Sequence, residues 1–186
     1  IGGFFGANIN DPEFHELLVR WFEYGCFCPV MRLHGYRWPL QPQYGTTGGA
    51  TCVSGAPNEV WSYTDQVCEI LSDYLRLRER MLPYITELME EAHEKGTPVM
   101  RPLFYDFPED KESWNVETEY MFGPKVLVKP ITDADARETD VYLPGGASWT
   151  NAWTGETFEG GQKVHVAAPI EQIPLFTRDG YKLPMK

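Results

Sequence analysis

The intervals between apolar residues predict a helix near the start of the chain. Between Phe14 and Phe22 apolar side chains recur at steps of three, one, three and one, which places them on one helical stripe. Asp11 is a good N-cap residue, and Pro12 suits the first helical position. Gly25 then marks the expected end of this helix.

The same periodicity predicts a longer second helix over residues 64–95. Pro83 lies within it, and a proline inside a helix removes a backbone hydrogen bond and clashes with the preceding turn. We therefore expect a kink at Pro83. Gly96 and Pro98 are the signals that end the helix.

A short apolar run lies between the two helices. Residues 26–33, CFCPVMRL, have the length and the boundaries of a buried strand, although Pro29 suggests that the strand proper begins after it. A long loop follows over residues 35–58, and loops of this length are often functional. A strand, a loop and a helix, preceded by another helix, fit the end of a βα barrel.

Beyond residue 97 the apolar residues alternate with a period of two, and turn-forming triplets separate the runs. The sequence therefore predicts an α/β unit over residues 1–97 and an all-β unit over residues 98–186. The strands of the second unit are expected at residues 126–132, 139–144, 148–153, 163–168 and 173–178.

Charge and hydropathy exclude several classes of partner. The chain has 16 basic and 27 acidic residues and a net charge of −11, which disfavours nucleic acid because nucleic acid requires a basic surface. No apolar run reaches the length of about 18 residues typical of a membrane-spanning helix. We expect no metal site, because ligand spacing is absent among the four histidines, His15, His34, His93 and His165.

The cysteines bear on the cellular compartment. Four cysteines could form two disulfides in a secreted protein, but Cys26 and Cys28 lie within an apolar run and share one face of the predicted strand. We expect reduced, mostly buried thiols, which favours a cytoplasmic location. The chain begins IGGFFG, without Met or a charged lead, as expected for a cut inside a larger protein.

Polar residues gather at the far end of the predicted strand. Arg32, His34 and Arg37 occupy the end at which barrel enzymes carry their active sites. One interpretation is that His34, together with Arg32, contacts a polar substrate. The alternative is structural, with an arginine paired to a carboxylate inside the barrel and a histidine that caps the strand. The pattern alone leaves both open.

Aromatic residues offer a second kind of candidate. Phe4 lies in a strand-to-helix loop, where an exposed ring could stack on the apolar face of a sugar or simply pack within the loop. The same alternatives hold for the loop aromatics Tyr36, Trp38 and Tyr44, which could form a sugar platform or cover the barrel rim. For Trp149 and Trp153 we favour packing in the core or between units.

Several motifs, in order and spacing, make the chain similar to glycoside hydrolase family 31, the α-glucosidases and α-xylosidases. They cover essentially the whole sequence, and the RLHGYR form resembles the bacterial α-xylosidase type most. The matching segments are IGGF, RW, CPVMRLHG, RLRERMLPY, GTPVMRPLFYDFPED, EYMFGPKVLVKPI and a VYLP…W…W…G series from Val141.

This resemblance implies the last elements of a (β/α)8 barrel, from just after its seventh strand, followed by a proximal C-terminal β-sandwich domain. It implies a retaining α-glycosidase that needs no cofactor and acts on terminal α-linked xylose or glucose. The aromatic of the IGGF motif and the histidine of the RxH motif line the sugar subsite in this family, and they correspond to Phe4 and His34. Arg32 fills the family's arginine position, where a supporting role is expected.

Retaining glycosidases use two carboxylates about 5 Å apart, one as nucleophile and one as acid and base. The family carries both on earlier strands, and neither motif occurs in this sequence, so we expect the chain alone to be inactive. An alternative is a carbohydrate-binding or supporting module without catalytic activity. Two βα units out of eight would also leave open edges, which predicts possible self-association.

Overall fold

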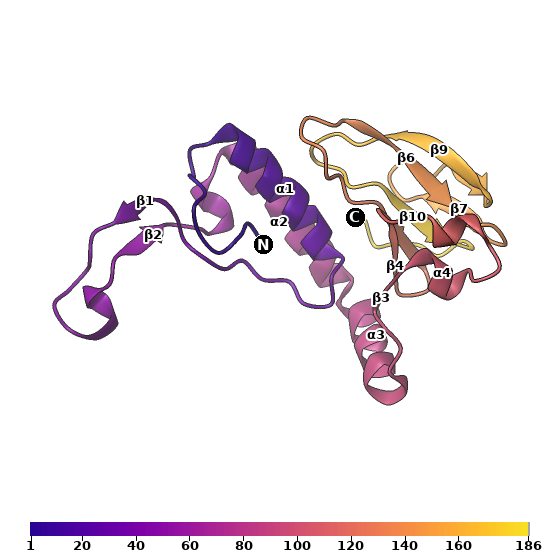
Figure 1. The fold of residues 1–186 in the computed structure, drawn as a ribbon, viewed down its shortest axis with the longest axis horizontal. Coiled ribbons are helices and arrows are strands. Elements are labelled where there is room, and N and C mark those ends of the chain that lie inside the picture. The colour runs from indigo at the N-terminus through magenta and orange to yellow at the C-terminus, as the bar shows by residue number, and fades with distance from the viewer. Residues whose placement is uncertain (186) are drawn as a thin grey trace.

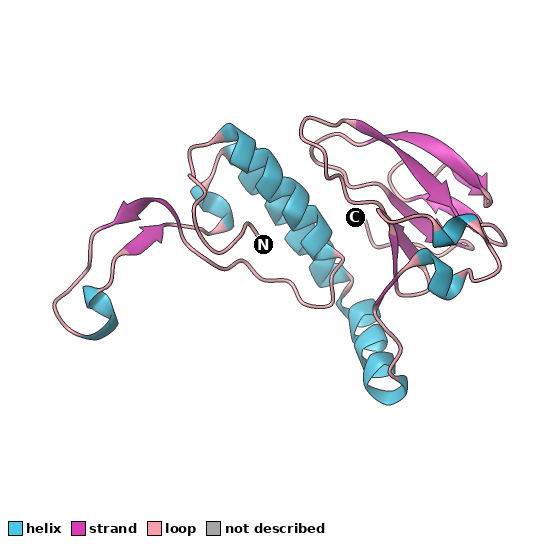
Figure 2. Ribbon diagram, in the orientation of Figure 1, coloured by secondary structure: helices cyan, strands magenta, loops and turns pink. Residues whose placement is uncertain are grey.

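The computed structural model describes residues 1–185 as a helical unit with a projecting hairpin and a β unit (Figure 1). The helices α1 and α2 pack side by side, and α3 continues from the end of α2. The hairpin extends away from the helices on the side opposite the β unit (Figure 2). The elements of the first unit are α1 (Pro12–Cys26), β1 (Arg37–Gln41), β2 (Ser54–Ala56), α2 (Asp65–Arg80) and α3 (Leu82–Lys95), with short 3-10 helices η1 (Gly48–Thr51) and η2 (Val60–Ser62).

Local sequence explains the ends of the helices. The Asp11 side chain accepts a hydrogen bond from the Glu13 amide (3.0 Å) and caps α1, as predicted. The second predicted helix is divided in two, because Pro83 occupies the first turn of a new helix after Met81. The kink expected at Pro83 is thus a break. Gly96 ends α3 in the left-handed conformation that glycine adopts without strain (φ 70°).

The buried strand predicted over residues 26–33 is wrong. The backbone after Pro29 is extended, with Met31 and Leu33 partly buried against the helical core and the alternate residues exposed, but it pairs with no other strand in the described chain. Val30 is 77% exposed. A parallel barrel strand depends on hydrogen-bonded neighbours on both sides, and residues 1–185 provide none here.

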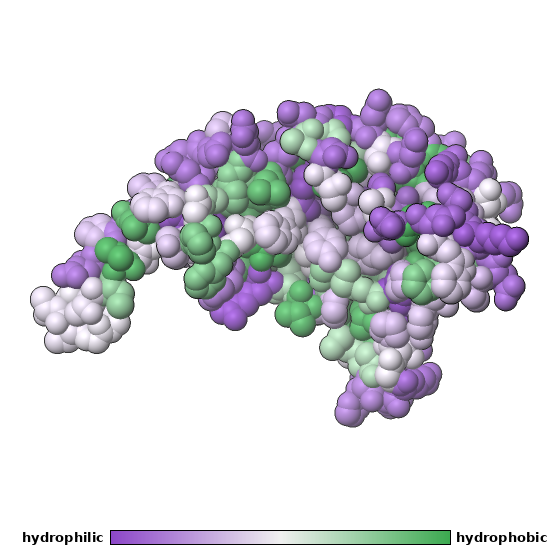
Figure 3. All heavy atoms as spheres, in the orientation of Figure 1, coloured by the Kyte–Doolittle hydropathy of each residue, from purple (hydrophilic) through white to green (hydrophobic). Residues whose placement is uncertain are grey.

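The loop predicted over residues 35–58 contains regular structure that the sequence did not reveal. β1 and β2 pair antiparallel, with Arg37 opposite Ala56 and Gln41 opposite Ser54, and the register shifts between these two pairs. The hairpin exposes apolar side chains. Figure 3 shows apolar atoms partway along the hairpin, whereas its tip is close to neutral and the outer end of the β unit is strongly hydrophilic.

The β unit consists of two antiparallel sheets. One has six strands in the order β3-β4-β5-β10-β7-β8, and the other pairs β6 with β9. Each of the five predicted strands overlaps an observed strand, while β3, β4, β8 and the short helix α4 were not predicted. The elements are β3 (Met100–Arg101), α4 (Leu103–Asp106), η3 (Glu112–Trp114), β4 (Tyr120–Phe122), β5 (Val126–Val128), β6 (Glu138–Leu143), β7 (Ser148–Asn151), β8 (Thr157–Glu159), β9 (Gln162–Ala167) and β10 (Leu175–Arg178).

The six-stranded sheet lies between two hydrophobic cores. Successive side chains of a strand point to opposite faces, so Val126 and Val128 of β5 join the helices in one core, while Leu127 joins β6 and β9 in the other. Trp149, fully buried in the second core, donates its indole N–H to the Pro144 carbonyl (2.9 Å). The β unit that the sequence predicted after the helical unit is therefore observed, and its sheets are antiparallel.

A buried polar network joins the helices to the β unit. Arg20 of α1 lies 3.1 Å from Glu23, and its two terminal nitrogens also donate to backbone carbonyls of the β unit. Tyr74 of α2 donates to Glu23 Oε1 (3.0 Å) and accepts from the Ile173 amide (3.0 Å). Three side chains from two helices therefore hold the segments that flank β6, β9 and β10.

Candidate functional site

Phe4 and His34 lie together on the surface of the helical unit. Their ring centroids are 5.5 Å apart with a 43° angle between planes, and both side chains are exposed. Phe5 and Tyr36 stack beside them with centroids 6.3 Å apart. The sequence placed Phe4 and His34 in one site from two segments 30 positions apart, and the structure brings these segments into contact.

A backbone contact fixes the distance between the two segments. The Tyr36 amide donates to the Phe4 carbonyl (3.0 Å), and Gly35 passes directly over that carbonyl with φ of 98°. A Cβ at position 35 would collide with the Phe4 oxygen. Gly35 is therefore required for the close approach as well as for its backbone conformation.

Replacing Gly35 with alanine should separate Phe4 from His34 and lower the free energy of unfolding by about 2–4 kcal/mol, from the left-handed backbone and the collision together. Gly6→Ala is a matched control, because Gly6 has the same φ of 98° and open space around its Cβ position. Urea unfolding of both variants measures the difference. Equal losses in the two would show that the contact at Phe4 contributes nothing.

The extended segment that carries His34 is anchored by α2. Arg78 donates to the carbonyls of Cys26 (2.7 Å), Cys28 (2.8 Å) and Pro29 (3.1 Å). One guanidinium thereby satisfies three carbonyls of the turn between α1 and the extended segment, which fixes the point from which that segment starts.

The two arginines near His34 differ in position. Arg32 is exposed on the same side of the extended segment as His34, and within residues 1–185 its side chain makes no hydrogen bond or ion pair. Its predicted supporting role stays a prediction. Arg37, which the sequence placed at the same end without a separate role, is fully buried.

Arg37 holds the backbone in front of Phe4. Its guanidinium donates to the Gly3 carbonyl (3.1 Å) and lies over the Phe14 ring at 5.2 Å. Gly2 packs against it so closely that any side chain there would displace it. Arg37 is thus the positioning residue that sequence reasoning missed, because its burial depends on contacts with residues far away in the sequence.

The remaining aromatic candidates divide by burial. Tyr36 joins the exposed cluster beside Phe5, whereas Trp38 and Tyr44 lie on the projecting hairpin. Trp149 is in the core, and Trp153 is half-buried with its indole N–H donated to the Ile173 carbonyl (2.7 Å). The sequence favoured packing in the core or between units for these two tryptophans; Trp149 packs in the core, and Trp153 packs partly buried against the core that the helices share with the sheet.

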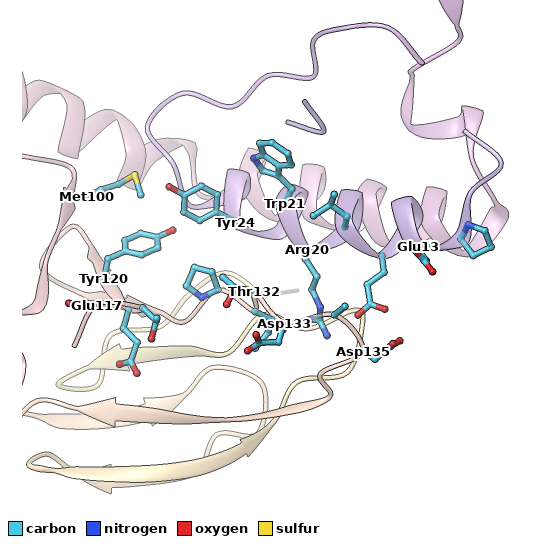
Figure 4. Close-up of a pocket in the computed structure, with 18 residues that line it drawn as sticks. Glu13, Arg20, Trp21, Tyr24, Met100, Glu117, Tyr120, Thr132, Asp133 and Asp135 are labelled. Carbon is cyan, nitrogen blue, oxygen red and sulfur yellow. The ribbon is translucent and has the colours of Figure 1, made fainter. Parts of the chain in front are cut away.

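A groove of 1020 Å³ runs between α1 and the β unit (Figure 4). Its apolar walls include Leu17, Trp21 and Tyr120, and acidic side chains surround it. Burial raises the pKa of Glu119 in its wall to about 7, but both carboxylate oxygens accept from the Tyr142 amide (3.0 and 3.2 Å). Glu119 thus supports β6, and a raised pKa here reflects burial.

Three further findings concern metal binding, membrane-spanning helices and the cysteines. Within residues 1–185 there is no cluster of three or more His, Cys, Asp or Glu side chains suited to a metal ion. No helix in the same range has the length and apolarity to cross a membrane. The four cysteines are free thiols, and burial raises the pKa of Cys26 to about 12. The Cys26 thiol is therefore a poor nucleophile.

Comparison with known proteins confirms the predicted fold class, in which the end of a barrel domain is followed by a C-terminal β domain. The family model for the glycosyl hydrolases family 31 TIM-barrel domain matches residues 1–88, and the model for the glycosyl hydrolase family 31 C-terminal domain matches residues 96–183. An alpha-xylosidase of Saccharolobus solfataricus is 36% identical over 184 residues, covering 99% of this chain and 23% of its own. Alpha-glucosidase 2 of Bacillus thermoamyloliquefaciens is 36% identical over 181 residues, covering 97% and 20%.

Solved structures agree with this result. A GH31 alpha-xylosidase from a soil metagenome, complexed with xylose, has 48% identity and a TM-score of 0.93, covering 98% of this chain and 27% of its own. A xylosidase from Aspergillus niger has 37% identity and a TM-score of 0.81, covering 94% and 25%. The chain spans about a quarter of the length of these proteins.

Proposed function

The chain belongs to glycosyl hydrolase family 31, and from this premise we propose that it forms part of a retaining α-glycosidase that releases terminal α-linked xylose or glucose from oligosaccharides or glycosides. The similarity to α-xylosidases and to an α-glucosidase supports both sugars as substrates. No cofactor is needed for this reaction, since carboxylates supply both the nucleophile and the proton.

The role we propose for this chain is to form one wall of the sugar subsite. The exposed contact between Phe4 and His34 is the observation that carries this proposal. An aromatic ring packs against the apolar C–H face of a sugar, and an imidazole donates to or accepts from its hydroxyls. Arg32 is exposed on the same side of the segment as His34, which supports our proposal that it assists this contact.

We assign the two catalytic carboxylates to a part of the enzyme outside this chain. Acidic residues near the helices and the connecting segment already have structural roles here. Asp11 caps α1, and Asp106 pairs with Arg101 (3.1 Å). Hydrolysis by a pair about 5 Å apart would need side chains that face Phe4 and His34, whereas Asp11 and Asp106 are bonded to other groups.

A direct test is to incubate the 186-residue chain with 4-nitrophenyl α-xyloside and 4-nitrophenyl α-glucoside. We expect no turnover, together with weak xylose or glucose binding that His34→Ala and Phe4→Ala both abolish in calorimetric titrations. His93→Ala, a change at an exposed histidine of α3, should leave binding unchanged. Turnover that depends on His34 would contradict our assignment of the carboxylates, and equal binding by His34→Ala and the unchanged chain would contradict the subsite.

A second function, structural support, rests on a different observation. Four backbone carbonyls of the β unit accept hydrogen bonds from the Arg20 guanidinium. The β unit therefore holds the helices of the barrel domain in place. The variants at Trp149 that would test a sugar-binding role for that residue are uninformative, because its side chain is in the core.

A further inference from the structure

A second aromatic surface lies on the β unit. Phe104 of α4 and Trp114 of η3 stack face to face, with ring centroids 4.6 Å apart and a 13° angle between planes. The Trp114 indole N–H donates to the Pro108 carbonyl (3.0 Å), and 58% of the side chain is exposed. Phe104 covers one face of the Trp114 indole. The stack and the hydrogen bond to Pro108 together fix the orientation of this exposed ring.

A shallow depression of 540 Å³ adjoins this pair. Most of its lining is apolar, and its three charged side chains are Arg101, Glu117 and Glu119. Arg101 and Glu119 are buried and bonded within the protein, to Asp106 and to the Tyr142 amide. Glu117 is exposed, so it presents carboxylate acceptors at the rim of an aromatic surface.

This arrangement has the chemistry of a sugar-binding surface. A sugar ring presents apolar C–H groups to an aromatic face while its hydroxyls donate to carboxylate oxygens. Both Glu117 and the net charge of −11 disfavour an anionic ligand. We propose that Trp114, Phe104 and Glu117 bind a neutral oligosaccharide, as a further binding site in addition to the contact between Phe4 and His34 that the proposed function uses.

The fixed orientation of the Trp114 ring supports this proposal in addition to the exposure of the ring. A tryptophan that only covered the surface would gain from burying both faces, yet one face of Trp114 remains available beside the depression. Binding on a ring already fixed by Phe104 and Pro108 costs little conformational entropy. An oligosaccharide longer than one residue can also contact Trp114 and Glu117 together.

The test measures affinity for maltohexaose and xylohexaose by calorimetry and by affinity gel electrophoresis with the 186-residue chain. Trp114→Ala should weaken binding about tenfold, the loss of one stacking contact. Trp114→Phe, which keeps a ring for stacking, should retain most of the affinity, and Glu117→Gln should weaken binding several-fold. Trp61→Ala, a change at an exposed tryptophan of η2, serves as the matched control and should have no effect.

The outcomes separate this site from the proposed subsite. His34→Ala should leave hexasaccharide binding at Trp114 unchanged, so failure of the Phe4 and His34 subsite would not imitate failure here. Measured in a His34→Ala background, which removes the proposed subsite, hexasaccharide binding that Trp114→Ala and Glu117→Gln leave unweakened would overturn the proposal, as would no binding in that background at millimolar sugar. Equal weakening by Trp61→Ala and Trp114→Ala would also overturn it.

Discussion

Replacing Arg20 with alanine should lower the free energy of unfolding by about 3–5 kcal/mol, because several buried acceptors lose a hydrogen-bond donor together. The Arg20 guanidinium satisfies several acceptors at once, and alanine would leave them buried without donors. These acceptors are Glu23 Oε2 (3.1 Å) and the carbonyls of Pro169 (3.1 Å), Gln172 (3.4 Å), Ala136 (3.0 Å) and Ala168 (2.7 Å).

The matched control is Arg137→Ala. Arg137 forms a two-pronged ion pair with Glu16 (2.6 and 3.1 Å), but its side chain is 45% exposed, so its loss should cost less than about 1 kcal/mol. Urea unfolding at pH 7 compares the two variants. If Arg20→Ala unfolds within 1 kcal/mol of Arg137→Ala, the network does not hold the two units together.

The same variant should also change the shape of the transition. Arg20 and Tyr74 are side chains of the helical unit that bond directly to the β unit, so their loss weakens the coupling between the units. We expect the helical and β signals to unfold at different urea concentrations in Arg20→Ala and together in the unchanged chain. Far-ultraviolet circular dichroism follows the helices, and near-ultraviolet signals follow buried Trp149.

The sequence predicted those elements whose own pattern of apolar and capping residues is enough to define them. α1 has a local cap and an apolar stripe, and the strands of the β unit alternate inward and outward, so local pattern and final environment agree. Residues 26–33 failed because an apolar run becomes a strand only beside other strands. The short strands β3 and β8 were missed because two or three residues carry no detectable alternation.

The candidate site was predictable only in part. Motif resemblance paired Phe4 with His34, which no local pattern could do across 30 positions. The structure buries Arg37 and exposes Arg32, although the sequence placed both at the same end of the predicted strand. The helical pattern gave no sign that Arg20 is buried, because its partners in the β unit lie more than 100 positions away.

The stability of the protein should fall as the pH rises from 5 to 8, and Glu23 should be the main cause. Glu23 is fully buried, and burial raises its pKa from the usual 4.5 to about 8 despite the opposing effect of Arg20. The carboxyl of the native state therefore keeps its proton in a range in which the unfolded chain has released it. Because the native state binds more protons between pH 4.5 and 8, raising the pH through this window favours unfolding.

The hydrogen bonds around Glu23 can satisfy the protonated form. The Tyr74 hydroxyl lies 3.0 Å from Glu23 Oε1 and 3.2 Å from the Glu171 carbonyl. A protonated Glu23 can donate to the Tyr74 oxygen while Tyr74 donates to Glu171, so no polar group loses its partner. Above pH 8 the proton leaves, and Tyr74 returns its hydrogen bond to the charged carboxylate.

Other titratable side chains also make the stability depend on pH. Burial raises the pKa of Glu119 to about 7, which adds a loss of stability in the same direction. Hydrogen bonds that protonated His165 donates to Asp140 and Glu138 raise the pKa of His165, whose stabilising effect is also lost as the pH rises. Glu16 has a lowered pKa, so its stabilisation is lost only as the pH falls through the acid range.

Glu23→Gln separates Glu23 from these other contributions. Glutamine keeps the neutral shape, with an oxygen for Arg20 and an N–H for Tyr74, so it should resemble the protonated native state. Urea unfolding at pH 5, 6, 7 and 8 should show a loss of a few kcal/mol in the unchanged chain, since each pKa unit corresponds to about 1.36 kcal/mol. Glu23→Gln should retain only the smaller slope from Glu119 and His165, and His165→Gln should retain most of the original slope. If the unchanged chain gains stability toward pH 8, or if Glu23→Gln shows the full slope, Arg20 keeps Glu23 ionised and the network is a permanent ion pair.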